Sequence, residues 1–207
     1  MKDVLYQFGR GADYEELLAL SRPRHLNHCE RNDFTLVTEG HAIAMRGYSW
    51  NSIQHLAYIE YLNKIADGVI VATVDADALI VQDTDIRTAL GDNDLATHGV
   101  NFCSAAFTVV RNSQKVREFF GKVLLGPISR TIDAMANKLQ AMLKENHGLK
   151  VQRLDDRWNY YTTYGAGRYS PNCAREDAII LGFHGGPLEY RKAKMKTAVS
   201  GMEVANG

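Results

Sequence analysis

The chain has 207 residues, 45% of them hydrophobic and 23% charged, and this length and balance predict one globular domain with a sizeable core. Its 24 basic and 24 acidic residues cancel, which argues against a chain-wide attraction to nucleic acid or acidic lipid. The three cysteines form no C-x-x-C pair, so neither a zinc knuckle nor a disulfide framework is indicated. A signal-peptide core and an apolar run of membrane-spanning length are both lacking, so we expect a cytoplasmic protein without a membrane span.

The chain begins with a predicted strand, turn and helix. The apolar run 3–8 predicts a strand, and Gly9-Arg10-Gly11 breaks it before a helical pattern begins near Tyr14. A glycine turn between a strand and a helix can approach a nucleotide phosphate, but an ordinary tight turn looks the same. The third glycine of a dinucleotide fingerprint is missing, so we predict no dinucleotide site.

A polar stretch over 21–32 precedes a short predicted strand over 34–37. It contains His25 and His28, and we expect both to lie on a solvated helix face rather than to bind a metal. The next stretch, 39–48, has two glycines and no clear period, so it predicts a loop.

The middle of the chain alternates helix and strand. Residues 50–66 place apolar side chains at helical spacing, which predicts a helix that leads directly into a buried strand over 69–74. This alternation is typical of an α/β domain with a mostly parallel central sheet. The further elements expected here are strands over 78–81 and 105–110, a helix that Asn112 or Ser113 caps and Pro127 ends, and a helix over 129–145.

The last part of the chain predicts strands over 150–154 and 179–183. Between them, residues 155–164 are both aromatic and polar, which suits a sugar or base platform and equally suits a buried corner. Beyond Lys192 the apolar period is lost, so we expect the tail, 197–207, to be peripheral or mobile.

Two aspartates stand where the most apolar strand ends, in the sequence Asp75-Ala76-Asp77. Ligands of open α/β sheets bind at the carboxyl ends of the strands. Residues two apart on an extended chain point the same way, so the two carboxylates can converge on one cation such as Mg²⁺, Mn²⁺ or Ca²⁺. A solvated strand end is the simpler interpretation of a lone D-x-D, but the apolar residues on both sides favour a functional pair.

A second residue of ligand type follows the last predicted strand. His184 opens a glycine turn, and glycines such as Gly185 let the backbone approach a ligand closely. Two carboxylates and an imidazole leave three positions open on an octahedral cation, and a diphosphate could fill two of them. The basic run 190–196 could donate hydrogen bonds to its oxygens, although such residues are more often simply solvated.

Several segments, taken in order, carry a family resemblance: a helix beginning at Trp50, then VDADALI, NFCSAAFTVVRNS, LDDRWNYY and GFHGG followed by basic residues. This chain resembles the nucleotide-sugar glycosyltransferases of the GT-A fold, with retaining galactosyl- and mannosyltransferases and glycogenin-like enzymes as the nearest likeness. The likeness runs from about Tyr14 to Lys196. It implies a three-layer α/β/α, Rossmann-like single domain over 1–196, with 197–207 as a tail.

The resemblance also implies roles for individual residues. Asp77 would bind Mn²⁺ or Mg²⁺ directly, Asp75 would bind the metal or the ribose, and His184 would complete the metal site. The sequence does not choose among Asp156, Asp155, Asp177 and the neighbouring Glu176 as catalytic carboxylates. The remaining donor contacts would come from Tyr6, Gln7 and Phe8 at the nucleobase, Asn101 and Ser104 beside the sugar, Asn159 on its acceptor side, and Gly185, Lys192 and Lys194 at the diphosphate.

The implied activity is metal-dependent transfer of a hexose from a nucleoside-diphosphate sugar, with retention of the anomeric configuration. The donor that the resemblance favours is a UDP-sugar. The acceptor would be a glycan, a lipid-linked sugar, a protein or a modified nucleobase. Asn51 and Ser52 stand where relatives often carry a lysine, and the basic-Pro-Trp ending of glycogenin-like enzymes is absent. Two alternatives stay open: a sugar nucleotidyltransferase, and a non-catalytic module that binds nucleotide sugars.

Overall fold

The structure is a computed structural model of the whole chain, and it describes residues 1–9, 11–39, 50–98, 104–125, 134–145, 148–162 and 172–205. Nine strands lie within these ranges: β1 (Asp3–Phe8), β2 (Phe34–Glu39), β3 (Ile70–Asp75), β4 (Ala78–Ile80), β5 (Leu95–His98), β6 (Ser104–Arg111), β7 (Val151–Leu154), β8 (Tyr160–Tyr161) and β9 (Ile180–Gly182). The helices are α1 (Ala12–Asn32), α2 (Trp50–Lys64), α3 (Arg87–Leu90), α4 (Gln114–Leu125), α5 (Ala134–Met142) and α6 (Leu188–Ala205), with 3-10 turns η1 (Asp156–Asn159) and η2 (Arg175–Asp177).

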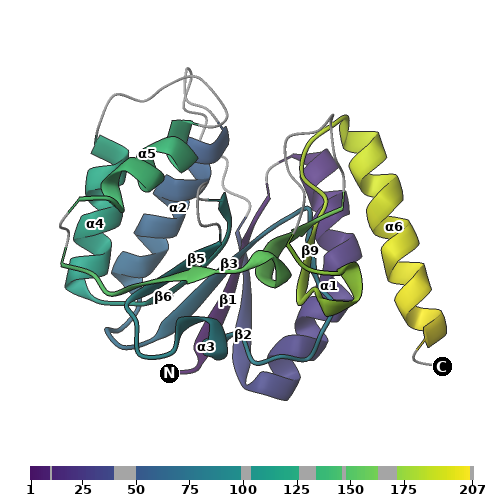
Figure 1. The fold of residues 1–207 in the computed structure, drawn as a ribbon, viewed down its shortest axis with the longest axis horizontal. Coiled ribbons are helices and arrows are strands. Elements are labelled where there is room, and N and C mark those ends of the chain that lie inside the picture. The colour runs from purple at the N-terminus through teal and green to yellow at the C-terminus, as the bar shows by residue number, and fades with distance from the viewer. Residues whose placement is uncertain are drawn as a thin grey trace.

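A six-stranded sheet in the order β2-β1-β3-β6-β5-β7 forms the centre of the molecule (Figure 1). Its strands run in one direction except β6, which is antiparallel to both of its neighbours. A smaller sheet, β4-β9-β8, extends from the end of β3. The expected α/β architecture with a mostly parallel sheet is therefore confirmed.

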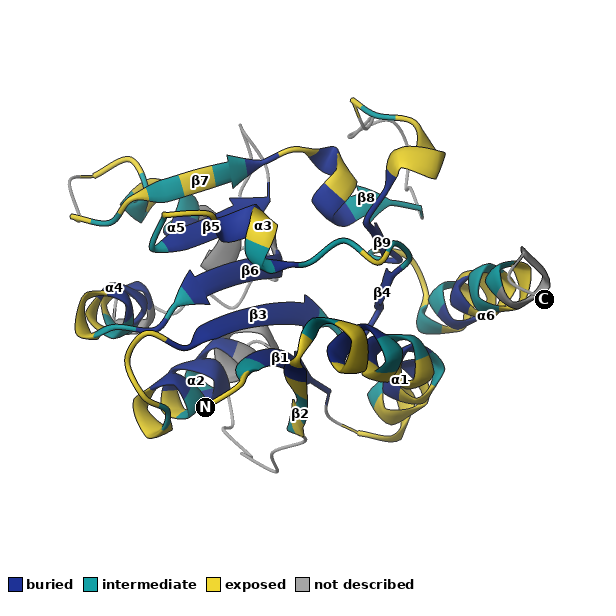
Figure 2. Cartoon of the chain, turned by 90° about the horizontal axis from the view of Figure 1, so that it is seen from below, coloured by how far each residue is buried: buried dark blue, intermediate teal, exposed yellow. Residues whose placement is uncertain are grey.

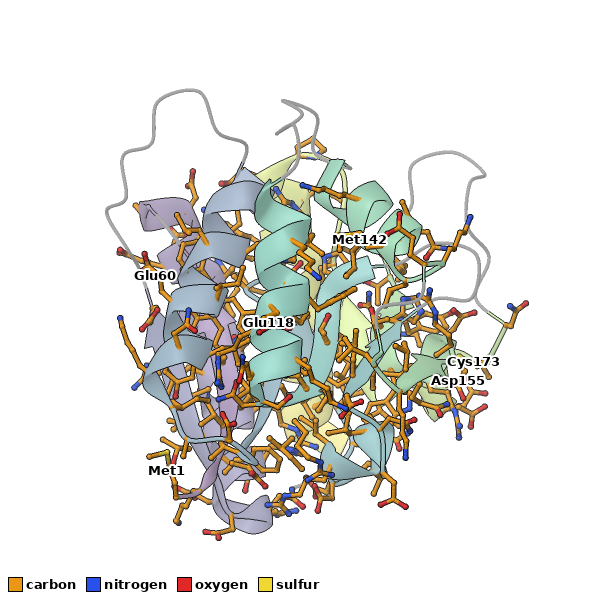
Figure 3. The ribbon with its side chains drawn as sticks, turned by 90° about the vertical axis from the view of Figure 1, so that its left-hand side faces the viewer. Met1, Glu60, Glu118, Met142, Asp155 and Cys173 are labelled. Atoms are coloured by element: carbon orange, nitrogen blue, oxygen red, sulfur yellow. The ribbon has the colours of Figure 1, made fainter. Side chains whose placement is uncertain are left out.

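Helices α2, α4 and α5 cover one face of the central sheet and α1 covers the other, while α6 packs against α1 and the smaller sheet (Figure 1). Alternate residues of β1 enter different cores: Tyr6 packs with α2 and α4, whereas Leu5 packs with α1 and η1. Figure 2 shows the resulting buried strands between helices whose outer faces are exposed. Figure 3 faces the layer of α2 and α4, where Glu60 and Glu118 lie on the exposed surface. A strand buried on both faces explains why the predicted strands are continuously apolar.

The turn after β1 is shaped by packing. A Cβ at Gly9 would lie 2.5 Å from the side chain of Leu18, so the glycine lets α1 pack closely against the end of the strand. Arg10 and residues 40–48 of the loop expected over 39–48 lie outside the described residues, whereas Glu39 is the last residue of β2. Among the described helices, none has the length and hydropathy needed to cross a bilayer.

One expectation about α1 is wrong. His25 and His28 are buried rather than solvated, because α1 continues through Pro23 to Asn32 and packs against β4. His25 Nε2 accepts a hydrogen bond from the backbone N–H of Ile80 at 3.2 Å. Burial lowers the pKa of His25 to about 3 and also lowers the pKa of His28, so both rings are held neutral.

The last helix, α6, packs against α1 and includes the position expected to end the domain. Residues 197–205 continue the helix, and Met195 of the same helix is fully buried. The side chains of Ala198, Val199 and Met202 are partly buried in the same cluster. A division at residue 196 would therefore fall inside a helix.

Candidate metal centre

The two segments that the sequence singles out meet at the end of β3. Asp75 closes β3, and the chain then turns into β4, which pairs antiparallel with β9. The backbone N–H of Phe183 donates to the carbonyl of Asp77 at 2.8 Å. These pairings bring His184 to the aspartates, although it lies 107 residues after Asp77 in the sequence.

Asp75, Asp77 and His184 offer ligand atoms that all lie within 4.8 Å of one another. His184 Nδ1 is 2.9 Å from Asp77 Oδ1 and 3.9 Å from Asp75 Oδ2. Octahedral ligands about 2.1 Å from an ion are about 3 Å apart when adjacent and about 4.2 Å apart when opposite, so both distances fit one shared cation. Two carboxylates with an imidazole also suit the chemistry of Mn²⁺ and Mg²⁺. The structure thus brings the three predicted residues together in a set that fits the expected ion.

Both carboxylate oxygens of Asp77 have partners in this buried cluster. Oδ1 faces His184, and Oδ2 accepts from Arg191 Nη1 at 2.8 Å. Burial by itself raises the pKa of Asp77, but His184 and Arg191 outweigh burial and lower the pKa to about 2. Burial by itself lowers the pKa of His184, and the aspartates outweigh it and raise the pKa. The cluster therefore contains two carboxylates, a guanidinium and an imidazole that holds its proton more tightly than usual.

The 3-10 turn η1 places Asn159 behind the ring of His184. Asn159 is fully buried, and its Oδ1 lies 3.2 Å from His184 Nε2. Because a carbonyl oxygen accepts, Nε2 carries a proton and Nδ1 is the nitrogen that faces the carboxylates. Gly182 permits this arrangement, since a Cβ there would lie 2.6 Å from both Asn159 Oδ1 and His184 Nε2. A partner behind a metal-binding histidine fixes the orientation of its ring.

An aromatic contact connects His184 to a second histidine. The ring of Tyr161 packs edge-on against His184 with centroids 5.1 Å apart, and it lies 6.1 Å from the ring of His98. His98 Nε2 is 3.0 Å from Asp156 Oδ1, and Asp156 Oδ2 accepts from the backbone N–H of Asn172 at 2.7 Å. A continuous set of contacts thus leads from His184 to Asp156, one of the predicted catalytic residues.

The other two candidate carboxylates lie farther out. Asp155 caps η1, and its carboxylate pairs with Arg157 Nη2 at 2.6 Å. Asp155 and Cys173 are close together at the outer edge of the molecule in Figure 3. Asp177 ends η2 and is exposed, as is Glu176. Among the described residues, no hydrogen bond or ion pair joins Asp155, Glu176 or Asp177 to the cluster around Asp77.

The residues expected at the nucleobase form the end of β1, with buried side chains. Tyr6 Oη donates to Glu39 at 2.8 Å, and the amide of Gln7 donates to a hydroxyl of α1 at 3.4 Å. Phe8 pairs with Asp75 in the parallel register, which puts the end of β1 at the level of the predicted ligands. Of the three, Phe8 is therefore the residue whose backbone pairs with a predicted ligand.

The two residues expected beside the donor sugar lie at or beyond the limits of the described residues. Asn101 lies outside the described residues, and for Ser104, the first residue of β6, the backbone alone is described. Gly185 has a φ of 84°, so its turn requires glycine, and a Cβ there would meet no atom within 4 Å. Space for a close ligand is thus present at the turn after His184.

The two lysines expected at the diphosphate have other partners. Lys194 is exposed, and its Nζ lies 5.5 Å from the ring centroid of Tyr190. Arg191 is the basic residue of this run that reaches Asp77. Lys192 is almost fully buried and its Nζ lies 2.9 to 3.2 Å from three carboxylates, those of Asp13, Glu16 and Glu189.

Sequence reasoning did not single out Arg191, His98 or Tyr161. Arg191 was visible as part of the basic run, but the run does not say which residue faces the site. His98 ends a short strand, where the rule that ligands gather at strand ends could have found it. Tyr161 carries no separate signal among the ten tyrosines of the chain.

Comparisons with known proteins place the fold. No protein-family model matches the chain, and no curated protein matches it. Among solved structures, a glycosyltransferase involved in glycosylation of the major capsid of PBCV-1 is similar, with a TM-score of 0.70 and 10% identity over 95% of this chain and 100% of that one. GlyE of Streptococcus pneumoniae TIGR4 gives a TM-score of 0.60 at 14% identity, covering 100% of this chain and 64% of that one.

A third similar structure is a Drosophila galactosyltransferase 7 mutant in complex with manganese, UDP-Gal and xylobiose. Its TM-score is 0.50 at 15% identity, over 74% of this chain and 65% of that one. At these identities the likeness concerns the fold, and the fold is common to all of these enzymes. The chain therefore has the GT-A fold and resembles the glycosyltransferases built on it.

Proposed function

We propose that the chain is a metal-dependent glycosyltransferase that moves a hexose from a nucleoside-diphosphate sugar, a UDP-sugar in the first instance, to an acceptor. The observation that carries the proposal is the cluster of Asp75, Asp77 and His184 at the carboxyl end of β3. That edge is where open α/β sheets bind ligands. The GT-A fold supports the proposal, as does a structural neighbour that binds manganese and UDP-Gal.

The metal ligands have distinct proposed roles. When bound, Mn²⁺ or Mg²⁺ would offset the negative charge that develops on the diphosphate as its bond to the sugar breaks. Asp77 and His184 would bind the ion, and Asp75 would bind the ion or the ribose. Asn159 would hold the His184 ring so that Nδ1 faces the carboxylates.

On the acceptor side, we propose Asp156 as the carboxylate that acts on the sugar. Its two oxygens are held by His98 and a backbone N–H, which fixes its position relative to His184. Asp155 and Asp177 are the more exposed alternatives. Retention is part of the proposal, and the anomeric configuration of the product, read by proton NMR, tests it.

The rest of the donor would extend from the end of β1 to the start of α6. Such an arrangement spans the carboxyl edge of the sheet, where the strands leave room for a ligand. The proposed contacts are Tyr6, Gln7 and Phe8 for the base, Asn101 and Ser104 for the sugar, and Gly185 and Lys194 for the diphosphate. Of the other expected contacts, Asn159 would act on the sugar only through the His184 ring that it holds, and Lys192, held by three carboxylates, is the residue that this geometry favours least at the diphosphate.

Release of UDP from UDP-glucose or UDP-galactose in the presence of Mn²⁺ tests the activity. We expect slow hydrolysis by the wild-type protein and a loss of about 10²- to 10³-fold in Asp77→Asn, which removes one charge from the metal site. The matched control is Asp92→Asn, which removes the same charge from an exposed turn between α3 and β5 and should keep the wild-type rate. Wild-type release of UDP by Asp77→Asn would contradict the proposal.

The same assays separate the two alternatives. A nucleotidyltransferase would release pyrophosphate from a nucleoside triphosphate and a sugar phosphate, which a glycosyltransferase does not. A non-catalytic module would bind UDP-glucose or UDP-galactose with neither hydrolysis nor transfer. The acceptor class can then be narrowed with a panel of glycans, lipid-linked sugars, proteins and modified nucleobases.

A further inference from the structure

Arg191 binds a carboxylate of the metal centre and keeps one buried donor without an acceptor among the described residues. It lies in the first turns of α6, and its side chain is 18% exposed where it meets Asp77, which is 8% exposed. In the part of the chain that the structure describes, the buried Nε of Arg191 has no hydrogen-bond partner. A guanidinium carries five donors in a fork that matches the oxygens of a carboxylate or a phosphate. Nη1 of this fork donates to Asp77, and Tyr14 of α1 is a further hydrogen-bond partner of the guanidinium, but among the described residues the buried Nε has no acceptor.

Arg191 and a divalent cation would compete for the same carboxylate. Oδ1 of Asp77 faces His184 and can bind an ion together with it, whereas Oδ2 is held by Arg191, so an ion that takes Oδ2 must displace the guanidinium. A bound dication would also repel the guanidinium at short range, in a buried site where solvent screens little. We therefore expect the metal alone to bind weakly.

A diphosphate would remove this conflict. Its oxygens can coordinate the ion and at the same time accept hydrogen bonds from a guanidinium. Arg191 could then leave Asp77 Oδ2 to the ion and satisfy its buried Nε on a phosphate oxygen. Its neighbour Lys192 is already held by three carboxylates, so it is poorly placed to make the same exchange.

We propose that Arg191 couples the binding of the metal to the binding of the nucleoside diphosphate. It occupies Asp77 while the ion is absent, and it moves to the diphosphate when both ligands are bound. Each ligand then tightens the other by the same factor, as linkage requires, and part of that factor comes from Arg191. The inference rests on the proposed function, because it takes the cluster to be a metal and diphosphate site.

Binding of Mn²⁺, followed by the electron paramagnetic resonance signal of the free ion, tests the coupling without any turnover. In wild-type protein we expect saturating UDP to tighten Mn²⁺ binding by about 100-fold. In Arg191→Gln we expect Mn²⁺ alone to bind about 3- to 10-fold more tightly, and the tightening by UDP to shrink by about tenfold. Glutamine keeps a donor for Asp77, so the buried carboxylate is not left unpaired.

Two further variants make the result specific. Lys196→Gln removes an exposed positive charge from the same helix and should match the wild type, which separates local competition from net charge. Arg191→Lys keeps the charge but loses the fork, so Mn²⁺ alone should still bind weakly while part of the coupling is lost. Wild-type Mn²⁺ affinity and wild-type coupling in both Arg191 variants would overturn the inference and leave the proposed function standing. Failure of the wild-type protein to bind Mn²⁺ and UDP would overturn both.

Discussion

Gly182→Ala is the most direct test of how the metal centre is assembled. The added Cβ would lie 2.6 Å from Asn159 Oδ1 and from His184 Nε2, about 0.8 Å inside an ordinary contact of 3.4 Å. The backbone of Gly182 has no positive φ, so alanine is conformationally acceptable and the effect comes from this collision. Both the ring and the amide must move away from the new methyl group, which disturbs the 3.2 Å contact between them.

The cost follows from that displacement. Overpacking of a buried site costs about 1–3 kcal/mol of unfolding free energy. Loss of the partner behind a metal-binding histidine typically lowers metal affinity by about 10- to 100-fold. We therefore expect Gly182→Ala to remain folded, with a lower melting temperature and a Kd for Mn²⁺ raised by one to two orders of magnitude.

The matched control is Gly201→Ala in α6. A Cβ there would meet no atom within 4 Å, and alanine is the better helix former by about 1 kcal/mol, so this variant should be slightly stabilised. Thermal unfolding and Mn²⁺ titration, each with saturating UDP, compare the two variants with the wild type. An Mn²⁺ affinity of Gly182→Ala within twofold of the wild type would show that the position of His184 does not depend on this glycine.

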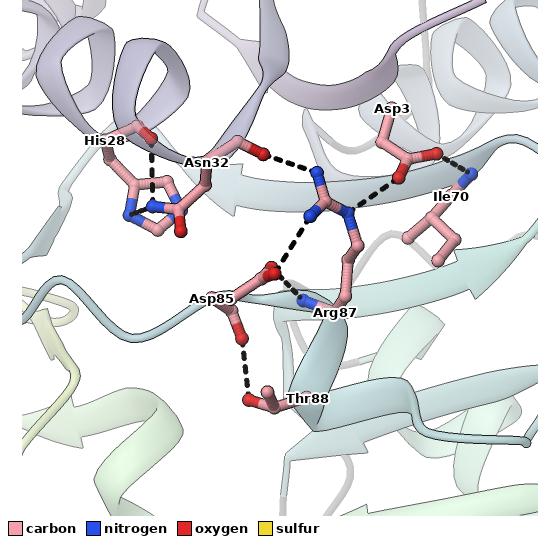
Figure 4. Close-up of polar contacts among 7 residues, drawn as sticks. All are labelled: Asp3, His28, Asn32, Ile70, Asp85, Arg87 and Thr88. Carbon is pink, nitrogen blue, oxygen red and sulfur yellow. Dashed lines mark hydrogen bonds and ion pairs between the residues drawn. The ribbon is translucent and has the colours of Figure 1, made fainter.

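Three further predictions concern stability. Arg87 donates hydrogen bonds to Asp3 at the start of β1, to Asp85 and to the end of α1 (Figure 4), so the Arg87→Met variant should lose about 1–3 kcal/mol of unfolding free energy in urea. An unchanged urea midpoint would contradict this. The Nδ2 of Asn112 donates to three carbonyls at the end of α2, and Asn112→Asp should therefore cost about 2–4 kcal/mol, more than Asn112→Ala. Burial lowers the pKa of His55 to about 4, so the unfolded chain binds the extra proton, and this residue should lower stability from pH 6.5 towards 4 by up to about 1.4 kcal/mol per pH unit. His55→Leu should remove this share of the pH dependence and leave the share that His25 contributes.

The end of β3 can be predicted from the sequence, because it depends only on the residues of the strand itself. A strand buried on both faces must be apolar throughout, so the first carboxylates after it mark the edge of the sheet. Asp75 is that edge. Asp77 lies in the turn that follows, so it joins Asp75 through the turn and not through the extended spacing that the sequence suggested. His184 follows the same rule from β9. The pairing of β4 with β9, which makes the two ends meet, carries no local signal.

Other features depend on partners far away in the chain. His25 looks solvated in a polar stretch, yet it bonds the backbone of Ile80, 55 residues later. Neighbouring residues of a helix point about 100° apart, so Arg191 reaches Asp77 while Lys192 reaches α1. The run of basic residues does not reveal which of them points to the metal centre, because the apolar residues that orient α6 form no clear helical pattern in the sequence.

The different directions of Arg191 and Lys192 also matter for the proposed move of Arg191 from Asp77 to the diphosphate. If Arg191 were the main attachment of α6, its departure from Asp77 would loosen the helix, and metal binding would carry the cost of undocking. Lys192 removes that difficulty, since its ammonium is held by Asp13 and Glu16 of α1 and not by a residue of the metal centre. Met195 adds a fully buried apolar contact one turn later. The helix thus stays docked through residues that do not touch the ligands, and a single side chain is left able to change partners.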